Sequence, residues 1–244
     1  MYTSADVLRR RRVATEALRV APGQRLVDIG CGPGFYVAQL AAAVGPAGHV
    51  TGVDPSDAML AAAAARTAGL ANVTLLSGEA LSVPIEDGSV DGALSVQVLE
   101  YVPDVGDALL EVRRVLRPGG RVVLWDIDWS TLSWHATDPA RMQRVLTAWD
   151  EHLAHPSLPQ QLAGLMKKAG FTDVMVTPHA FVNTTISPDA YSAVLLDLIA
   201  EFVVAHDVSA AEAAAWRDDL LSLDAAGDYF FSITMFCFAA RRPA

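Results

Sequence analysis

Cysteine is scarce in this chain, which has 2 among its 244 residues, Cys31 and Cys237. Cysteines this far apart in the sequence provide neither a disulfide framework nor the clustered spacing of a metal-binding motif. Cys31 lies inside a glycine-rich segment where a small side chain is needed, so we expect it to pack there. The cysteines therefore predict no metal site.

The chain also lacks a long apolar run free of charge. Even the segment 193–204 carries Asp197 and Glu201, so no window has the length and composition of a membrane span. The first 20 residues are charged and contain no continuous apolar stretch, which is unlike a signal peptide. We therefore expect a soluble cytoplasmic protein with no membrane partner.

The chain has few basic residues. It contains 18 Lys and Arg residues against 28 Asp and Glu residues, which gives a net charge of −10. Nucleic-acid binding requires a basic surface, so nucleic acid is excluded as the main substrate. The cluster 9–12, four consecutive arginines, is the exception. It could contact an anionic ligand or a membrane, but we expect a solvated helix face just ahead of the first strand.

The most informative segment of the chain is 27–34, Val-Asp-Ile-Gly-Cys-Gly-Pro-Gly. An apolar strand that breaks into a glycine-rich turn and enters a helix brings the backbone close to a nucleotide-like ligand. The glycines allow positive φ and remove the Cβ atoms that would hold a ligand away. Their spacing is Gly-x-Gly-x-Gly, and Asp28 would repel a pyrophosphate. Both features favour an amine-bearing ligand over a dinucleotide.

Strands and helices alternate along the first half of the chain. The apolar patterns and the Pro-Gly turns predict strands at 25–30, 49–54, 73–77, 90–96 and 120–127, and helices at 5–20, 34–44, 57–68 and 104–116. The second half is predicted to hold helices at 138–154 and 159–169, a strand at 171–181, helices at 188–205 and 209–226, and a last strand at 228–240. This alternation predicts an α/β fold with a doubly wound, mostly parallel sheet. The length and the 52% hydrophobic content favour one domain over two.

Four segments resemble, in order, those of the class I S-adenosylmethionine-dependent methyltransferases. Asp-Ile-Gly-Cys-Gly-Pro-Gly resembles the first motif, and 50–54 is similar to a second strand that ends in an acidic residue. Residues 77–91 are similar to the stretch across strands three and four, and 116–123 to the turn into strand five. The resemblance covers roughly residues 25–127 and is greatest to the small-molecule subgroup (methyltransferase type 11), which includes the ubiquinone and menaquinone C-methyltransferases.

The resemblance implies a fold and an activity. The fold is a Rossmann-like seven-stranded sheet with an antiparallel last strand and a helical insertion before it. Residues 1–130 would bind the donor, and helical elements in 131–170 and 187–226 would cover the substrate side. The activity is methyl transfer from S-adenosyl-L-methionine to an oxygen, nitrogen or carbon of a small organic molecule in secondary metabolism. A homodimer is compatible with the sequence.

Two alternatives stay open. A protein of the same fold could bind S-adenosylmethionine without methylating anything. A nicotinamide-dependent oxidoreductase is the other, although the glycine spacing and Asp28 argue against it.

The resemblance also implies roles for individual residues. Asp28 would meet the amino group of the donor, and Asp54 would accept hydrogen bonds from both ribose hydroxyls, because a carboxylate has two acceptor oxygens. Glu79 stands where the family usually has aspartate and would accept from the adenine amino group. Met59 would lie against the adenine or pack in the core. The expected cofactor-binding residues are Asp28, Gly30, Cys31, Gly32, Asp54, Pro55, Met59, Glu79, Ala80 and Gln97.

The acceptor site is expected beyond the carboxyl ends of the strands, at 97–101 and in a loop at 126–135. This loop contains Trp129, Trp134, Asp128 and His135 and could form an aromatic-walled pocket with a base. His135 could remove a proton from a hydroxyl or amine acceptor, or it could serve only as a hydrogen-bonding residue of the loop. Asp128 and His135 are thus the catalytic candidates. The two aspartates of this loop have no third ligand nearby, so no metal is predicted.

Overall fold

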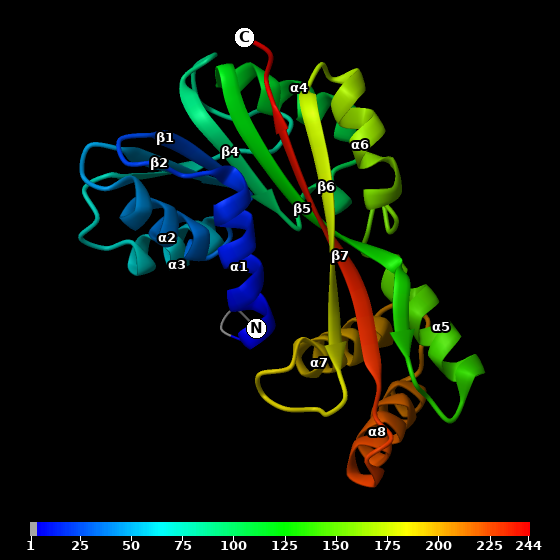
Figure 1. The fold of residues 1–244 in the computed structure, drawn as a ribbon. Helices are drawn as coiled ribbons and strands as arrows, with labels where there is room; N and C mark the ends of the chain where they lie inside the picture. Colours follow the sequence, from blue (N-terminus) through cyan, green and yellow to red (C-terminus); the bar gives the residue numbers. More distant parts are fainter. Residues whose placement is uncertain (1–3) are drawn as a thin grey trace.

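The computed structural model describes residues 4–244 and shows an α/β fold around one sheet (Figure 1). The elements follow the predicted alternation closely. In chain order they are α1 (Ala5–Leu18), β1 (Arg25–Ile29), α2 (Phe35–Val44), β2 (His49–Asp54), α3 (Asp57–Arg66), β3 (Val73–Ser77), β4 (Val90–Val96), the 3-10 helix η1 (Leu99–Tyr101), α4 (Val105–Val115), β5 (Leu116–Trp134), α5 (Pro139–Asp150), α6 (Pro159–Lys168), β6 (Thr172–Asn183), α7 (Tyr191–Val204), α8 (Ala210–Ala226) and β7 (Phe231–Arg241).

The sheet has seven strands in the order β3-β2-β1-β4-β5-β7-β6. The pairings from β3 across to β5 are parallel, and β7 lies antiparallel between β5 and β6. The predicted fold class, a doubly wound and mostly parallel sheet with an antiparallel last strand, is therefore confirmed. The strand order reverses direction around β1 and β4, and ligands of open α/β sheets bind at the carboxyl ends of strands near such a point.

Short polar side chains start several of the helices. Ser4, Ser56 and Ser209 accept hydrogen bonds from backbone N–H groups in the first turns of α1, α3 and α8, respectively. Such caps satisfy donors that the helix itself leaves without a partner. They fix where each helix begins and, at Ser56, how α3 leaves the end of β2.

The prediction of a loop at 126–135 is wrong, because β5 runs on to Trp134. Its residues pair with β7 from Arg121 through Asp128 and again at Ser133 and Trp134, with an irregularity between these two stretches. At the irregularity, the hydroxyl of Thr131 accepts the backbone N–H of Thr234 at 2.9 Å. This pairing partner lies about a hundred residues away in the sequence.

The extended ends of β5, β6 and β7 reach past the rest of the sheet and carry α5, α7 and α8 around them (Figure 1). Trp134 is the centre of this part of the core, because its ring packs edge-on against Trp216, Tyr229 and Phe231. In contrast, α6 packs with α4 against β5 and β6. In the part of the chain from residue 4 onwards, no helix is long and apolar enough to cross a membrane.

Candidate functional site

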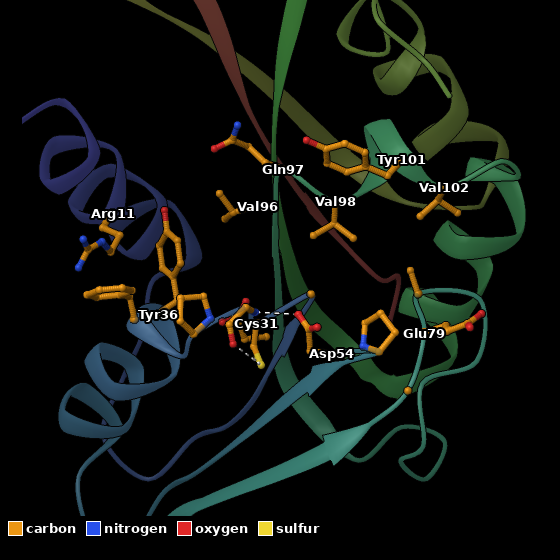
Figure 2. A pocket seen from close by; sticks show the side chains of 18 of the residues that line it. Arg11, Cys31, Tyr36, Asp54, Glu79, Val96, Gln97, Val98, Tyr101 and Val102 are labelled. Carbon is orange, nitrogen blue, oxygen red and sulfur yellow. Dashed lines mark hydrogen bonds between the residues drawn. The ribbon is translucent and has the colours of Figure 1, made fainter. Parts of the chain in front are cut away.

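The main cavity, of about 640 Å³, lies at the carboxyl ends of β1, β2 and β4 (Figure 2). One side is the glycine turn with the end of β2, and another is the segment after β3. Figure 2 shows Gln97 and Tyr101 across the cavity from Cys31 and Asp54, with Tyr36 and Arg11 on a third side. The lining residues are Val7, Arg10, Arg11, Asp28, Gly30, Cys31, Gly32, Pro33, Phe35, Tyr36, Asp54, Pro55, Gly78, Glu79, Ala80, Leu81, Val96, Gln97, Val98, Tyr101, Val102, Pro103 and Tyr191.

The turn after β1 requires its glycines. Gly30 has φ +72°, and a Cβ built there would stand 2.2 Å from a methyl carbon of Val98. Gly32 has φ +50°, and a Cβ built there would meet nothing within 4 Å, because this position faces the open cavity. Both conformations favour glycine. The first glycine lets the turn pack on Val98, two residues after β4, and the second leaves the backbone accessible to a ligand.

Asp54, the last residue of β2, fixes this turn. One carboxylate oxygen accepts the backbone N–H of Gly32 at 2.8 Å, and the other accepts that of Ser56 at 3.0 Å. Each oxygen has a second lone pair, so the carboxylate can still accept from a ligand in the cavity. The cap of α3 is provided by Ser56, whose hydroxyl accepts the N–H of Met59.

Asp28 is a buried carboxylate with one atom unsatisfied. It is 1% exposed, and its Oδ2 has no hydrogen-bond partner among the described residues. Burial, and then the neighbouring Asp54, raise the pKa of Asp28 to about 7. A buried polar atom without a partner is costly, so this oxygen is suited to a cationic group that enters the cavity.

The expectation that residues 9–12 form a solvated helix face is wrong for Arg10 and Arg11. They are buried and line the cavity, whereas Arg9 and Arg12 on the same helix are exposed. The buried face of α1 also contains Val7, Ala14 and Leu18, at spacings of three and four residues. This helical periodicity was present in the sequence and could have identified both arginines.

Nine of the ten predicted cofactor-binding residues line this one cavity. They are Asp28, Gly30, Cys31, Gly32, Asp54, Pro55, Glu79, Ala80 and Gln97. The exception, Met59, is 37% exposed on α3 and is not among the lining residues. Sequence reasoning missed the contributions of α1 and α2, above all Arg10 and Tyr36.

The structure does not bring Asp128 and His135 into the cavity. His135 is exposed and lines a separate hollow with Trp134 and Phe230. Asp128 accepts hydrogen bonds from Ser130 and Gln160. The tryptophans of β5 are core residues and not walls of the cavity. Among residues 4–244, no group of three or more His, Cys, Asp or Glu side chains is arranged to hold a metal ion.

A second pair of buried carboxyl groups lies beside the cavity and was not predicted. Glu100 is fully buried and Asp126 is 1% exposed. Burial raises the pKa of Glu100, and Asp126 raises it further, while burial also raises the pKa of Asp126. Because both carboxyl groups are destabilised as anions, the pair holds a proton more tightly than ordinary carboxyl groups do.

Comparison with known proteins agrees with this geometry. Residues 27–124 match the model of a methyltransferase domain. An uncharacterised transposon protein of Streptomyces fradiae is 36% identical over 237 residues, which cover 95% of this chain and 66% of that protein. A demethylmenaquinone methyltransferase of Staphylococcus aureus is 42% identical over 123 residues, which cover 50% of this chain and 51% of that enzyme.

A solved structure shares the fold over nearly the whole chain. Phosphoethanolamine N-methyltransferase 2 of Haemonchus contortus, in complex with S-adenosyl-L-methionine, superposes with a TM-score of 0.64 at 22% identity, covering 97% of this chain and 53% of that protein. This chain thus spans about half to two thirds of the length of these proteins. The likeness to the solved structure concerns the fold.

Proposed function

We infer that this chain belongs to the class I S-adenosylmethionine-dependent methyltransferase family. We propose that it transfers a methyl group from S-adenosyl-L-methionine to an oxygen, nitrogen or carbon of a small organic molecule. The observation that carries the proposal is the carboxylate of Asp28. It is buried at the glycine turn, its Oδ2 lacks a partner, and it faces a cavity large enough for a nucleoside.

The residues of the cavity fit this donor. Asp28 would accept from its ammonium group, and the bare backbone at Gly32 would lie against its amino-acid end. Asp54 keeps acceptor capacity for the ribose hydroxyls while it holds the turn. Glu79 and Ala80 line the part of the cavity that the adenine would take. When bound, the donor supplies an electrophilic methyl group on a positively charged sulfur.

The chain contributes positioning and exclusion of water to such a reaction. Burial raises the pKa of Tyr36 and of Tyr191 to about 12, so both hydroxyls keep their protons at neutral pH and can donate hydrogen bonds to an acceptor. No histidine is among the cavity-lining residues. The proposed catalysis therefore rests on orientation within the cavity and does not need His135 as a base.

The acceptor is proposed to be a small molecule. The net charge of −10 disfavours nucleic acid, and the cavity is enclosed on several sides by side chains from α1, α2 and α7. The Staphylococcus relative is named for a demethylated quinone, but it matches only half of this chain. A role in secondary metabolism in the cytoplasm is part of the same proposal.

Calorimetric titration with S-adenosylhomocysteine tests the proposal. We expect wild-type protein to bind, and Asp54→Asn to bind roughly tenfold or more weakly, because a charged acceptor for two hydroxyls is lost. Asp57→Asn is the matched control, since Asp57 lies three residues further on and is exposed. Failure of the wild type to bind, or equal binding by Asp54→Asn, would overturn the donor assignment.

Two further measurements separate the alternatives. Titration followed by NADH fluorescence should show no binding, and binding would favour a nicotinamide-dependent oxidoreductase. Release of label from methyl-labelled donor, in the presence of a panel of small hydroxyl and amine compounds, distinguishes methyl transfer from a non-methylating use of the same cavity. Labelled product supports the proposal, whereas tight donor binding with no product from any compound supports the non-methylating alternative.

A further inference from the structure

The walls of the main cavity carry opposite charges. Acidic groups lie at the ends of β1 and β2, and two cationic groups, Arg10 and Arg11, come from α1. Arg10 is 7% exposed. Its Nη1 donates to the side-chain oxygen of Gln97, while its Nε has no hydrogen-bond partner among the described residues. The guanidinium thus keeps Nε without a partner, while its charge also lowers the pKa of the nearby Tyr36 hydroxyl.

Arg10 also has no carboxylate partner within ion-pair distance among residues 4–244. Two other arginines of the same helix do have one, because Arg9 pairs with Asp6 at 3.3 Å and Arg12 pairs with Glu16 at 3.9 Å. The chain carries ten more acidic than basic residues, so acids are not in short supply. A buried cation without a counter-ion is unfavourable, and the cavity beside it is where an anion can enter.

The place where Arg10 meets the sheet indicates which molecule carries the anion that it binds, the donor or the acceptor. Asp28 pairs with Leu94 on β4, and Gln97, which Arg10 contacts, is three residues further along that chain. Gln97 itself follows the strand with φ +56°, and Figure 2 shows it across the cavity from Cys31 and Asp54. The ammonium and the carboxylate of the donor are attached to one carbon, so a donor held at Asp28 keeps its carboxylate near that end of the cavity.

Electrostatics agree with this separation. The charge of Arg10 lowers the pKa values of Tyr36 and Tyr191, in opposition to burial, which raises them. The pKa of Asp28 itself is raised by burial and by Asp54. Asp28 also raises the pKa of Tyr36, so Tyr36 lies between Asp28 and Arg10. Arg10 therefore acts on the side of the cavity where Gln97 and the two tyrosines gather, with Tyr36 between it and Asp28.

We propose that the methyl acceptor carries an acidic group, a carboxylate, phosphate or sulfonate, and that Arg10 binds this group while Gln97 holds the guanidinium in place. The inference rests on the proposed function and deepens it, because it assigns the substrate class. Arg10 is then the residue that selects acidic acceptors over neutral ones. Tyr191, which is 6% exposed on α7, borders the same space.

The test measures binding of benzoate, phenyl phosphate and inorganic phosphate to the full chain, with benzamide as the neutral match of benzoate. Each probe is titrated into free protein and into protein loaded with S-adenosylhomocysteine. We expect at least one anion to bind both forms of the wild type more tightly than benzamide. Arg10→Gln should weaken that anion about tenfold or more, whereas Arg12→Gln, on the exposed face of the same helix, should leave it unchanged.

A second binding experiment shows whether Arg10 binds an anion of the acceptor or the carboxylate of the donor. S-adenosylhomocysteine is compared with its decarboxylated analogue, and the proposal expects Arg10→Gln to change neither affinity more than about threefold. A large loss for S-adenosylhomocysteine alone would assign Arg10 to the donor carboxylate and overturn the proposal. Anion binding that is absent in the wild type, or unchanged in Arg10→Gln, would overturn it as well.

Two controls keep these outcomes separate from other failures. Arg10→Lys should retain part of the anion affinity, and thermal melting followed by circular dichroism shows whether each variant is folded. If the wild type does not bind S-adenosylhomocysteine, the proposed function fails. The titrations of free protein with the three anions still decide whether Arg10 binds an acidic group.

Discussion

Glu100 and Trp129 are joined by a buried hydrogen bond, in which the indole N–H donates to the carboxyl oxygen Oε2 at 3.0 Å. The contact links η1, which follows the cavity-lining end of β4, to the extended part of β5. The other carboxyl oxygen of Glu100, Oε1, has no hydrogen-bond partner among the described residues. The free energy of unfolding therefore depends on whether the Glu100 carboxyl group is protonated.

Replacing Glu100 by glutamine should stabilise the protein in alkaline solution. Burial, and then Asp126, raise the pKa of Glu100 to about 8, so the folded chain keeps a proton that the unfolded chain releases above its ordinary pKa of 4.5. The free energy of unfolding of the wild type therefore falls as the pH rises between these values. Glutamine still accepts from Trp129 but cannot ionise, so the melting temperature of Glu100→Gln should exceed that of wild type at about pH 8.5, by roughly 2–4 °C for each kcal/mol gained.

At about pH 5 the two proteins should melt alike, because Glu100 is then protonated in the folded wild type. Glu151→Gln, a change at an exposed position, serves as the control and should melt at the same temperature as wild type at both pH values. A shallower decline should persist in Glu100→Gln, since burial also raises the pKa of Asp126. A lower melting temperature of Glu100→Gln at alkaline pH would mean that the ionised carboxylate is favourable where it lies.

The donor side of the cavity was predictable because its chemistry is local in the sequence. The glycines of the turn follow a short apolar strand, and acidic residues lie at or next to the last positions of β1 and β2. Parallel strands bring their carboxyl ends to one edge of the sheet. Met59 shows the limit of this reasoning. It follows Asp54 by five residues, but its place on α3 turns it outward, which spacing alone did not reveal.

The other side of the cavity depends on contacts between distant segments. The stretch 126–135 contains Ser, Thr and Asp and was assigned to a loop, yet its alternating apolar residues fit a strand once β7 is available as a partner. Trp134 is buried because residues 216–231 fold back onto it. Arg10 was misplaced for a different reason, since its charge was given more weight than its position on the buried face of α1.

Two glycines of the turn should respond differently to alanine. Gly30→Ala places a Cβ against Val98 and forces a side chain into positive φ, so we expect a loss of about 2–4 kcal/mol in the free energy of unfolding. Gly32→Ala adds only the cost of positive φ, roughly 1 kcal/mol. Its Cβ would stand in the open cavity, so affinity for S-adenosylhomocysteine should fall about tenfold or more.

Gly23→Ala is the matched control for Gly32→Ala. Gly23 also has positive φ (+82°), and a Cβ built there meets nothing within 4 Å, but it lies in the turn before β1 and outside the cavity. Chemical denaturation should show similar destabilisation for both variants, while calorimetry should show a loss of ligand affinity only for Gly32→Ala. Equal affinities would mean that the ligand does not approach the backbone at Gly32.

Asp28 should make ligand binding depend on pH. Its pKa is raised from 3.8 to about 7, so the folded chain keeps a proton through this window and the free energy of unfolding falls as the pH rises through it. Only the ionised carboxylate pairs with an ammonium group, so affinity for S-adenosylhomocysteine should rise over the same range. At about pH 6 roughly a tenth of Asp28 is ionised, which predicts binding about tenfold weaker than at about pH 8.

Calorimetry across this pH range checks the expectation with two variants. Asp28→Asn should bind weakly at every pH, because its side chain cannot ionise, and its stability should change less between about pH 4 and pH 7. Asp57→Asn should keep the pH dependence of the wild type, since Asp57 is exposed and lies outside the cavity. A pH-dependent affinity that survives in Asp28→Asn would assign the titration to another group. The ammonium of the ligand would then have to be held elsewhere in the cavity.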